Sequence, residues 1–248
     1  SNAREMMIRA GVPVIPGSDG VVADREQAHE VAGKLGYPVM VKASAGGGGK
    51  GIRIVRTEDE LDQAFEAAQS ETKAAFGDDQ MYMEKVIEHA RHIEVQVLGD
   101  HFGNVIHLGE RDCSLQRKNQ KVLEEAPSPV LSEETREKMC KSAVLAAKAA
   151  GYESAGTIEF LYDHSGQYYF MEMNTRIQVE HPITEMITGV DIVKEQIRVA
   201  AGEKLSYEQS DIHITGHAIE CRINAENPDR GFAPVSYTHL TLPTNSRV

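Results

Sequence analysis

Two carboxylates and one amide within a short stretch of the chain have the types and spacing to bind a divalent cation. Glu159 lies in the run GTIEFLYD, and Glu172 and Asn174 lie in the run QYYFMEMN, which follows the turn residues HSG. If both runs are strands of one hairpin, the three side chains project from one face, because side chains alternate with period two. Carboxylate and amide oxygens are ligands that Mg²⁺ takes, together with substrate phosphates. The pattern therefore predicts a metal site, with a polar, solvent-facing strand face as the alternative.

The turn residues set the expected register of this hairpin. With the turn at 163–166, Tyr162 is expected to pair with Gln167. Glu159 then lies opposite Phe170, and Glu172 lies one diagonal step along, at roughly 7–8 Å. A bound cation can bridge that span and neutralise the two like charges.

A row of polar side chains continues beyond Asn174. Polar residues of one parity alternate with apolar residues of the other: Arg176, Gln178 and Glu180 against Met173, Ile177 and Val179. On an extended strand over 167–180, this row would offer an anion clamp and a base beside the metal ligands. Half-buried strand patterning without chemistry is the alternative.

The run VKASAGGGGKGIRIV places the glycines 46–49, Lys50 and Gly51 between two expected strands. A dinucleotide fingerprint requires a helix after the glycines, and here a strand follows. A Walker loop is excluded because Ser44 and Gly51 stand at positions that need Gly and Ser or Thr. The remaining interpretations are a loop that covers phosphates and a flexible turn. Lys42, just before the loop, is either a phosphate ligand or an exposed strand lysine.

The elements that must position these groups mix helices with hairpin-linked strands, which predicts an α+β fold with antiparallel sheet. Helices are expected at 24–36, 57–77, 132–151 and 191–202, and strands at 37–43, 51–55, 79–87, 91–100, 101–114, 155–163, 167–180 and 217–226. Residues 115–129 are expected to form a loop. Thr57 with Glu60, and Ser132 with Thr135, predict the capped starts of two helices.

Composition restricts the class of protein. The chain has 248 residues, 41% of them hydrophobic and 26% charged, as in globular proteins. A net charge of -12 argues against nucleic acid as a partner, and no apolar run approaches the ~18 residues of a membrane span. The widely spaced Cys113, Cys140 and Cys221 fit a reducing compartment, which we expect to be the cytoplasm. Residues 1–3 and 236–248 are expected to be tails derived from tag and vector.

Three motifs together resemble one family. EMNTRIQVEHPITEMITGVDIVKEQIRVAAG, with KASAGGGGKG upstream and GHAIECRINAE downstream, is similar to biotin carboxylase of the ATP-grasp superfamily. The similarity runs from about Ala10 to Val235. It implies an ATP-grasp fold, with a lid subdomain at 4–87 that carries the glycine-rich loop 44–51, and an antiparallel-sheet catalytic subdomain at 88–235.

The resemblance implies a reaction and its partners. Such enzymes use ATP with Mg²⁺, or Mn²⁺ in its place, to convert bicarbonate to carboxyphosphate, and then carboxylate biotin carried on a protein lysine. The implied partners are a biotin carboxyl carrier protein or domain and a carboxyltransferase component, with a homodimeric parent enzyme. Acetyl-CoA carboxylase and fatty acid biosynthesis are one expected setting, while propionyl-CoA and pyruvate stay open as acceptors.

The resemblance also implies roles for individual residues. ATP would be bound by Lys42, Gly46, Gly47, Gly48, Gly49, Glu84, Lys85, Ile87, His92, Gln116, Asn119 and Leu161. Metal would be bound by Glu159, Glu172 and Asn174, and bicarbonate by Lys121, Arg176, Gln178, Val179 and Arg222. The implied catalytic groups are Glu180 as the base, Arg222 at the biotin enolate, Arg176 and Lys121.

The chain departs from the family pattern in two respects. The family's QRxHQK run has a histidine where this chain has Asn119, so altered nucleotide affinity is expected. The family's N-terminal domain would precede Arg4 and its C-terminal part would follow Val235, so this chain is expected to be a fragment without turnover of its own. The alternatives are a non-catalytic nucleotide-binding module and another ATP-grasp carboxylate–amine ligase.

Overall fold

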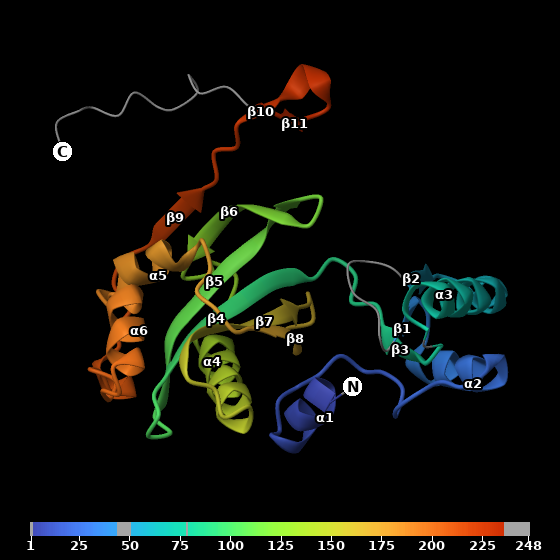
Figure 1. Cartoon of the computed structure of the whole chain (residues 1–248), viewed down its shortest axis with the longest axis horizontal. Coiled ribbons are helices and arrows are strands. Elements are labelled where there is room, and N and C mark those ends of the chain that lie inside the picture. Colours follow the sequence, from blue (N-terminus) through green and yellow to red (C-terminus); the bar gives the residue numbers. More distant parts are fainter. Residues whose placement is uncertain (1, 44–50, 78, 236–248) are drawn as a thin grey trace.

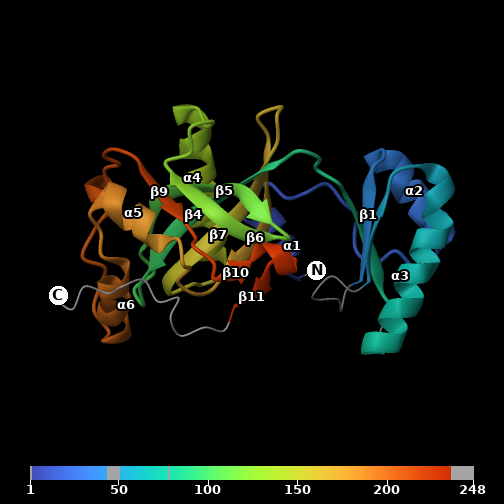
Figure 2. The ribbon, with the colours of Figure 1, turned by 90° about the horizontal axis from the view of Figure 1, so that it is seen from above.

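The computed structural model describes residues 2–43, 51–77 and 79–235, and the predicted roles of glycines 46–49 lie outside them. The described chain contains two main antiparallel sheets with flanking helices, which confirms the α+β prediction (Figure 1). Figure 2 shows the smaller sheet with its helices at one end of the molecule and α5 and α6 at the other.

The smaller sheet has the strand order β2-β1-β3, formed by Ile52–Val55, Val39–Ala43 and Met81–Lys85. Helices α2 (Arg25–Leu35) and α3 (Leu61–Phe76) pack on it. Along β1 the apolar residues Val39, Val41 and Ala43 are buried, while Lys42 alternates to the other face.

The larger sheet has the strand order β8-β7-β4-β5-β6-β9. Its strands are β4 (Arg91–Gly99), β5 (Val105–Arg117), β6 (Gln120–Ala126), β7 (Ser154–Tyr162), β8 (Tyr168–Asn174) and β9 (Ala218–Cys221). A separate pair of short strands, β10 (Glu226–Asn227) and β11 (Ala233–Pro234), follows near the end of the described chain.

One face of the larger sheet is covered by α4 (Glu133–Ala149). Its Met139 and Cys140 pack with Ile93 and Val95 of β4 in the largest apolar cluster. The N-terminal helix α1 (Asn2–Arg9) also belongs here: although the expected lid subdomain starts at residue 4, Met7 packs in this cluster and not in that of the smaller sheet.

Two short helices, α5 (His181–Thr188) and α6 (Ile192–Ala200), lie at the end of the molecule away from the smaller sheet (Figure 2). Helix α5 packs against β5, β6 and β9, and α6 packs against β7. No helix in the described ranges combines the length and apolar composition that crossing a bilayer requires.

The prediction of a loop over 115–129 is wrong. Strand β5 runs on to Arg117, and β6 returns from Gln120. The connecting residues Lys118 and Asn119 have φ values of 50° and 62°, the left-handed conformation that a two-residue hairpin turn requires and that Asn tolerates. The charged composition suggested a loop, but these side chains line or support a cavity beside the sheet.

The predicted register of the β7–β8 hairpin is also wrong. Tyr162 pairs with Tyr168, and a β-bulge at Met171 shifts the register, so that Glu159 lies directly opposite Glu172. The extra residue has no counterpart on β7, as is usual at a bulge. The two carboxylates therefore share a face, as predicted, but as direct neighbours.

Strand β8 ends at Asn174, although a strand was predicted over 167–180. Residues after Asn174 form an irregular segment that leads into α5, whose first turn contains Pro182. Proline suits the first turn of a helix, so Pro182 is compatible with the start of α5. The strand predicted over 217–226 is likewise limited to Ala218–Cys221.

Candidate active site

A cavity of about 570 Å³ lies against the larger sheet, on the face opposite α4. Most residues predicted to have chemical roles line it: His92, Gln116, Asn119, Lys121, Glu159, Leu161, Glu172, Asn174, Arg176, Gln178, Val179, Glu180 and Arg222. They come from β4, β5, the turn after β5, β6, β7, β8, the segment before α5, and the residue that follows β9. Strand alternation therefore brings together side chains that are far apart in the sequence.

Lys121 is the central cation of this cavity. Its Nζ donates to Glu94 Oε2 at 2.5 Å, Glu180 Oε1 at 2.8 Å and Glu159 Oε1 at 3.0 Å. Burial alone would lower the pKa of Lys121, but the surrounding charges, led by Glu94, raise it above the ordinary value. The ammonium group is therefore charged at any physiological pH and joins carboxylates from three separate elements.

Glu159 is the most heavily bonded carboxylate of the site. Its Oε1 accepts from Asn174 Nδ2 at 2.9 Å and Gln178 Nε2 at 3.1 Å, besides Lys121, and His92 Nε2 lies 3.2 Å from Oε2. Burial would raise the pKa of Glu159, but His92 and Lys121 outweigh that effect and lower the pKa to about 2. Glu159 is thus held as an anion, the form that binds metal.

The predicted metal ligands form a suitable donor set for Mg²⁺. Glu159 and Glu172 are register partners, and Asn174 reaches Glu159 from the same strand as Glu172. Within the described part of the chain, no side chain bonds to the Glu172 carboxylate, which borders the cavity. Two carboxylates and an amide, one carboxylate without a cationic partner, are the hard oxygen ligands that Mg²⁺ prefers.

Glu180 and Arg222 form an ion pair in the wall of the cavity. Arg222 Nη2 donates to Glu180 Oε2 at 2.8 Å and lies 2.6 Å from Glu124 Oε1. Burial raises the pKa of Glu124, although Arg222 opposes the effect. Arg222 therefore bridges two buried carboxylates and reaches the cavity wall from the chain beyond β9.

Arg176 and Val179 are exposed at the cavity rim. Among the residues that the structure describes, Arg176 donates only to the neighbouring Ile177 carbonyl, at 3.2 Å, and Val179 is 60% exposed. Both belong to the irregular segment before α5, so the predicted strand parity does not explain their position. Their location still leaves the Arg176 guanidinium accessible to an anion in the cavity.

The predicted nucleotide residues of the smaller sheet lie elsewhere. Lys42 bonds to the Glu84 carboxylate, and both line a second cavity of about 360 Å³, between the smaller sheet and β8. Met171 lines both cavities, so they are neighbours. The Lys85 ammonium group instead donates to the carbonyls of Gly36 and Tyr37, at 2.8 and 2.9 Å. Lys85 and Ile87 line neither cavity.

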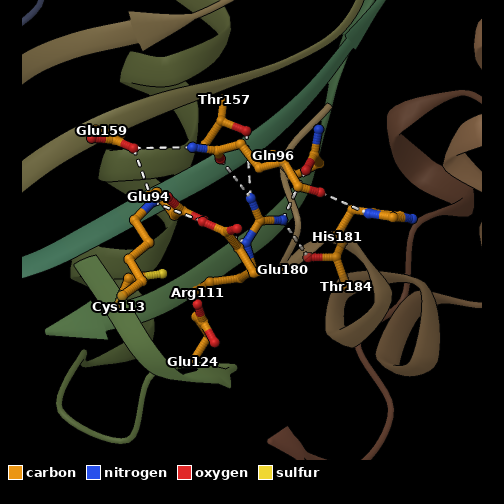
Figure 3. A network of polar contacts seen from close by, with 12 residues as sticks. Glu94, Gln96, Arg111, Cys113, Glu124, Thr157, Glu159, Glu180, His181 and Thr184 are labelled. Atoms are coloured by element: carbon orange, nitrogen blue, oxygen red, sulfur yellow. Dashed lines mark hydrogen bonds and ion pairs between the residues drawn. The ribbon is translucent and has the colours of Figure 1, made fainter. Parts of the chain in front are cut away.

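Sequence reasoning missed three buried charged residues that support the site: Glu94, Arg111 and Glu124, all 0% exposed. Figure 3 shows Arg111 at the centre of a polar network, and Arg111 does not itself line the cavity. A signal for Glu94 was present, because His92, Glu94 and Gln96 alternate with apolar residues along one strand. No local pattern marks Arg111 or Glu124, whose partners come from distant segments.

The two antiparallel sheets with a charged cavity at the larger one define an ATP-grasp architecture, in agreement with the expected fold. Residues 1–208 match the family described as "Carbamoyl-phosphate synthase L chain, ATP binding domain", and the chain belongs to that family.

Similar proteins narrow this assignment. The chain is 62% identical over 234 residues to a biotin carboxylase of Nostoc sp., covering 94% of this chain and 52% of the relative. It is 61% identical over 234 residues to the small subunit of 2-oxoglutarate carboxylase from Hydrogenobacter thermophilus, covering 94% and 50%. The chain thus spans about half the length of the curated relatives it matches.

A solved structure gives the same result. The biotin carboxylase domain dimer of Hydrogenobacter thermophilus 2-oxoglutarate carboxylase, in complex with MgADP, ADP and bicarbonate, superimposes with a TM-score of 0.82 at 62% identity. The match covers 94% of this chain and 52% of that one. The predicted resemblance to biotin carboxylase is therefore confirmed.

Proposed function

We propose that this chain is part of an ATP-dependent biotin carboxylase, which uses MgATP and bicarbonate to carboxylate biotin on a carrier protein through carboxyphosphate. The observation that carries the proposal is the Lys121 centre, where one ammonium group joins Glu180 to Glu159 beside Glu172 and Asn174. A candidate base, a cation for an anionic substrate and a set of metal ligands thereby share one cavity.

In this proposal Glu159, Glu172 and Asn174 hold Mg²⁺, or Mn²⁺ in its place, which would neutralise phosphate oxygens of ATP. Lys121, Arg176 and Arg222 supply positive charge for bicarbonate, with Gln178 and the Val179 backbone as further contacts. Glu180 accepts the bicarbonate proton, so that a bicarbonate oxygen can attack the γ-phosphate and release ADP. Arg222, already between two carboxylates, then stabilises the biotin enolate.

The nucleotide is proposed to lie across both cavities. His92, Gln116, Asn119 and Leu161 would contact it from the larger sheet, and Lys42 and Glu84 from the smaller one. Lys85, Ile87 and the glycines 46–49 remain proposed contacts from the resemblance. The division into a lid at 4–87 and a catalytic subdomain at 88–235 stays a proposal, with α1 at the start of that lid range packed against the larger sheet.

The partners proposed for the full-length enzyme are a biotin carboxyl carrier protein or domain, a carboxyltransferase component and a second copy of the same chain. Relatives of similar identity serve pyruvate or 2-oxoglutarate carboxylases, so acetyl-CoA carboxylase and fatty acid biosynthesis are one proposed setting among these. The three unpaired cysteines support a cytoplasmic location.

The test is ADP release by the protein extended to the length of its relatives, assayed with free biotin, with and without bicarbonate. We expect bicarbonate to stimulate ADP release and Glu180→Ala to abolish the stimulated part. Nucleotide binding without any ADP release would instead support a non-catalytic module. ADP release that depends on an amine or another carboxylate would support a different ATP-grasp ligase. The present chain alone is expected to give no turnover, and measurable bicarbonate-dependent activity would contradict that.

A further inference from the structure

We propose that Arg111 is a positioning residue of this site: it holds Gln178, and through Glu94 also Lys121, in the geometry that the reaction requires. The inference deepens the proposed function and rests on it for the kinetic part of its test. Arg111 lies behind the cavity, does not line it, and is not expected to touch substrate.

All the donors of the buried guanidinium group point to fixed acceptors (Figure 3). Arg111 Nε donates to Glu94 Oε1 at 2.6 Å. Nη1 donates to Gln96 Oε1 at 2.8 Å and Thr184 Oγ1 at 2.9 Å. Nη2 donates to Gln178 Oε1 at 3.2 Å and Thr157 Oγ1 at 3.4 Å. The acceptors belong to β4, β7, the segment before α5, and α5 itself.

Two of these acceptors continue directly into the site. The other oxygen of Glu94 accepts from Lys121, and the amide nitrogen of Gln178 donates to Glu159 Oε1 at 3.1 Å. In each of these two side chains, one polar atom bonds to Arg111 and another bonds to a residue that lines the cavity. A shift of the guanidinium group would therefore move Lys121, the cation proposed to bind bicarbonate, and Glu159, a proposed metal ligand.

A third acceptor secures the proposed base. Thr184 lies in the first turns of α5, and Glu180 is the residue that immediately precedes this helix. By bonding Thr184 and Gln178, Arg111 ties both ends of the segment that carries Glu180 to the larger sheet. A lysine at this position has three donors on one atom and cannot reach acceptors that diverge over five directions.

The opposite face of β5 supplies a matched control variant. Glu110, next to Arg111 in sequence, points to the other side of the sheet, where it accepts from Arg136 Nε at 2.9 Å. That pair is largely buried, since the Arg136 side chain is 15% exposed and that of Glu110 is 0% exposed. Arg136→Lys disturbs an arginine–carboxylate pair between α4 and β5 without touching the cavity that holds the proposed site.

The first test is hydrogen exchange measured by mass spectrometry on the present chain. We expect Arg111→Lys to accelerate exchange in peptides from 175–189 by about tenfold or more, and Arg136→Lys to leave them unchanged. Thr184→Val is the second variant, in case Arg111→Lys does not fold. It keeps the shape of the side chain but removes one acceptor of Arg111, and it should accelerate exchange in the same peptides by a smaller factor. Unchanged exchange at 175–189 in the folded variants would overturn the proposal.

The second test is kinetic and uses the full-length protein. We expect Arg111→Lys to reduce bicarbonate-dependent kcat by about 10²-fold, with the KM for ATP changed less than about threefold, because misplacement by ~1 Å has effects of that size. A loss equal to that of Arg136→Lys would mean that Arg111 is only structural. If wild-type protein shows no bicarbonate-dependent ADP release, the proposed function fails, whereas the exchange comparison still decides the positioning role.

Discussion

The two faces of strand β5 carry similar buried charges in different surroundings. Toward α4, Glu110 bonds to Arg136 and to the backbone of Ser128, next to an apolar cluster that closes this side of the sheet. Toward the cavity, Arg111 and its partner Glu94 lie behind a volume of about 570 Å³. The two faces differ in what lies against them. On the α4 side Arg136 borders a cavity of about 530 Å³ that none of the predicted site residues lines, whereas most of the predicted site residues line the cavity in front of Arg111.

This difference separates stability from function. A buried ion pair is weak evidence for stability in either location, because desolvation offsets much of the attraction. Removal of one partner, however, leaves an uncompensated buried charge on both faces. Only on the cavity face should the same change also alter the binding of ligands. The following predictions test this separation, from the largest expected effect to the smallest.

Lys121→Met should have the largest effect, because it leaves Glu94, Glu159 and Glu180 together without their shared cation. We expect a loss of about 3–5 kcal/mol in the free energy of unfolding, measured by urea denaturation at pH 7. Bicarbonate-dependent ADP release by the full-length variant should be lost as well. Lys138→Met removes an exposed pair with Glu134 and should leave the free energy of unfolding close to that of the wild type. A stable and active Lys121→Met protein would contradict the central role of this cation.

Met139→Ala tests the closed face alone. Met139 is 0% exposed in the cluster beneath α4, and its truncation should destabilise the protein by about 2–4 kcal/mol through lost burial and a residual cavity. The fraction that remains folded should bind MgADP in the full-length protein within about twofold of wild type. A large loss of MgADP affinity in folded Met139→Ala would show that the two faces are coupled, against the separation argued above.

The two faces should also lose stability in different pH ranges. Burial, with a smaller effect of Lys141, lowers the pKa of His107 to about 4 from the ordinary 6.5. The unfolded chain therefore binds a proton at higher pH than the folded one, and stability should fall as pH decreases from 6.5 to 4. We expect this group to contribute about 1–2 kcal/mol of that loss, after allowance for its partial exposure.

Glu159 affects stability in a lower pH range than His107. Its pKa of about 2 in the folded protein lies below the ordinary 4.5, so its contribution is present above pH 4.5 and is lost as pH falls toward 2. Urea denaturation at pH 7, 5 and 4 should show a shallower pH dependence in His107→Gln than in wild type. Glu159→Gln should keep the wild-type slope between pH 7 and 5, which lies above the range where Glu159 affects stability. Equal slopes in wild type and His107→Gln would refute the assignment to His107.

The chemistry of the cavity face was predictable because it depends on residue types that lie close in sequence. The β7–β8 hairpin follows from its turn residues, and period-two alternation places Glu159 and Glu172 on one face. The register was not predictable, because the bulge at Met171 adds one residue without any local mark. The predicted parity still placed the right side chains together, since the actual register and the bulge each shift the pairing by one residue.

The support behind the cavity could not be predicted from local patterns. Arg111 joins Glu94, Thr157, Gln178 and Thr184, which are separated by long stretches of sequence and meet only when the sheet forms. Tertiary contacts of this kind have no periodic signal. The same limit applied to the loop predicted over 115–129, where charged residues that face the cavity resemble the charged residues of a surface loop.

The residues predicted to cap two helices, Ser132 and Thr57, allow the comparison with the smallest expected effect on stability. Ser132 Oγ accepts from the Thr135 backbone N–H at 3.2 Å at the start of α4, as predicted. The Thr57 side chain makes no such bond, and Glu60 instead accepts from the Arg56 backbone N–H, so the predicted capping box is wrong. Ser132→Ala should therefore destabilise the protein by about 1 kcal/mol, and Thr57→Ala by less than about 0.5 kcal/mol.

Urea denaturation of the two variants side by side measures this difference. Because Ser132 caps the helix that covers the closed face, its loss should leave the kinetics of the full-length enzyme unchanged. The backbone N–H that Ser132 satisfies would otherwise remain without a partner at a helix end, which is why a single hydroxyl has a measurable effect. Equal destabilisation by both substitutions would mean that stability at these sites reflects residue preference and not the hydrogen bond that distinguishes them.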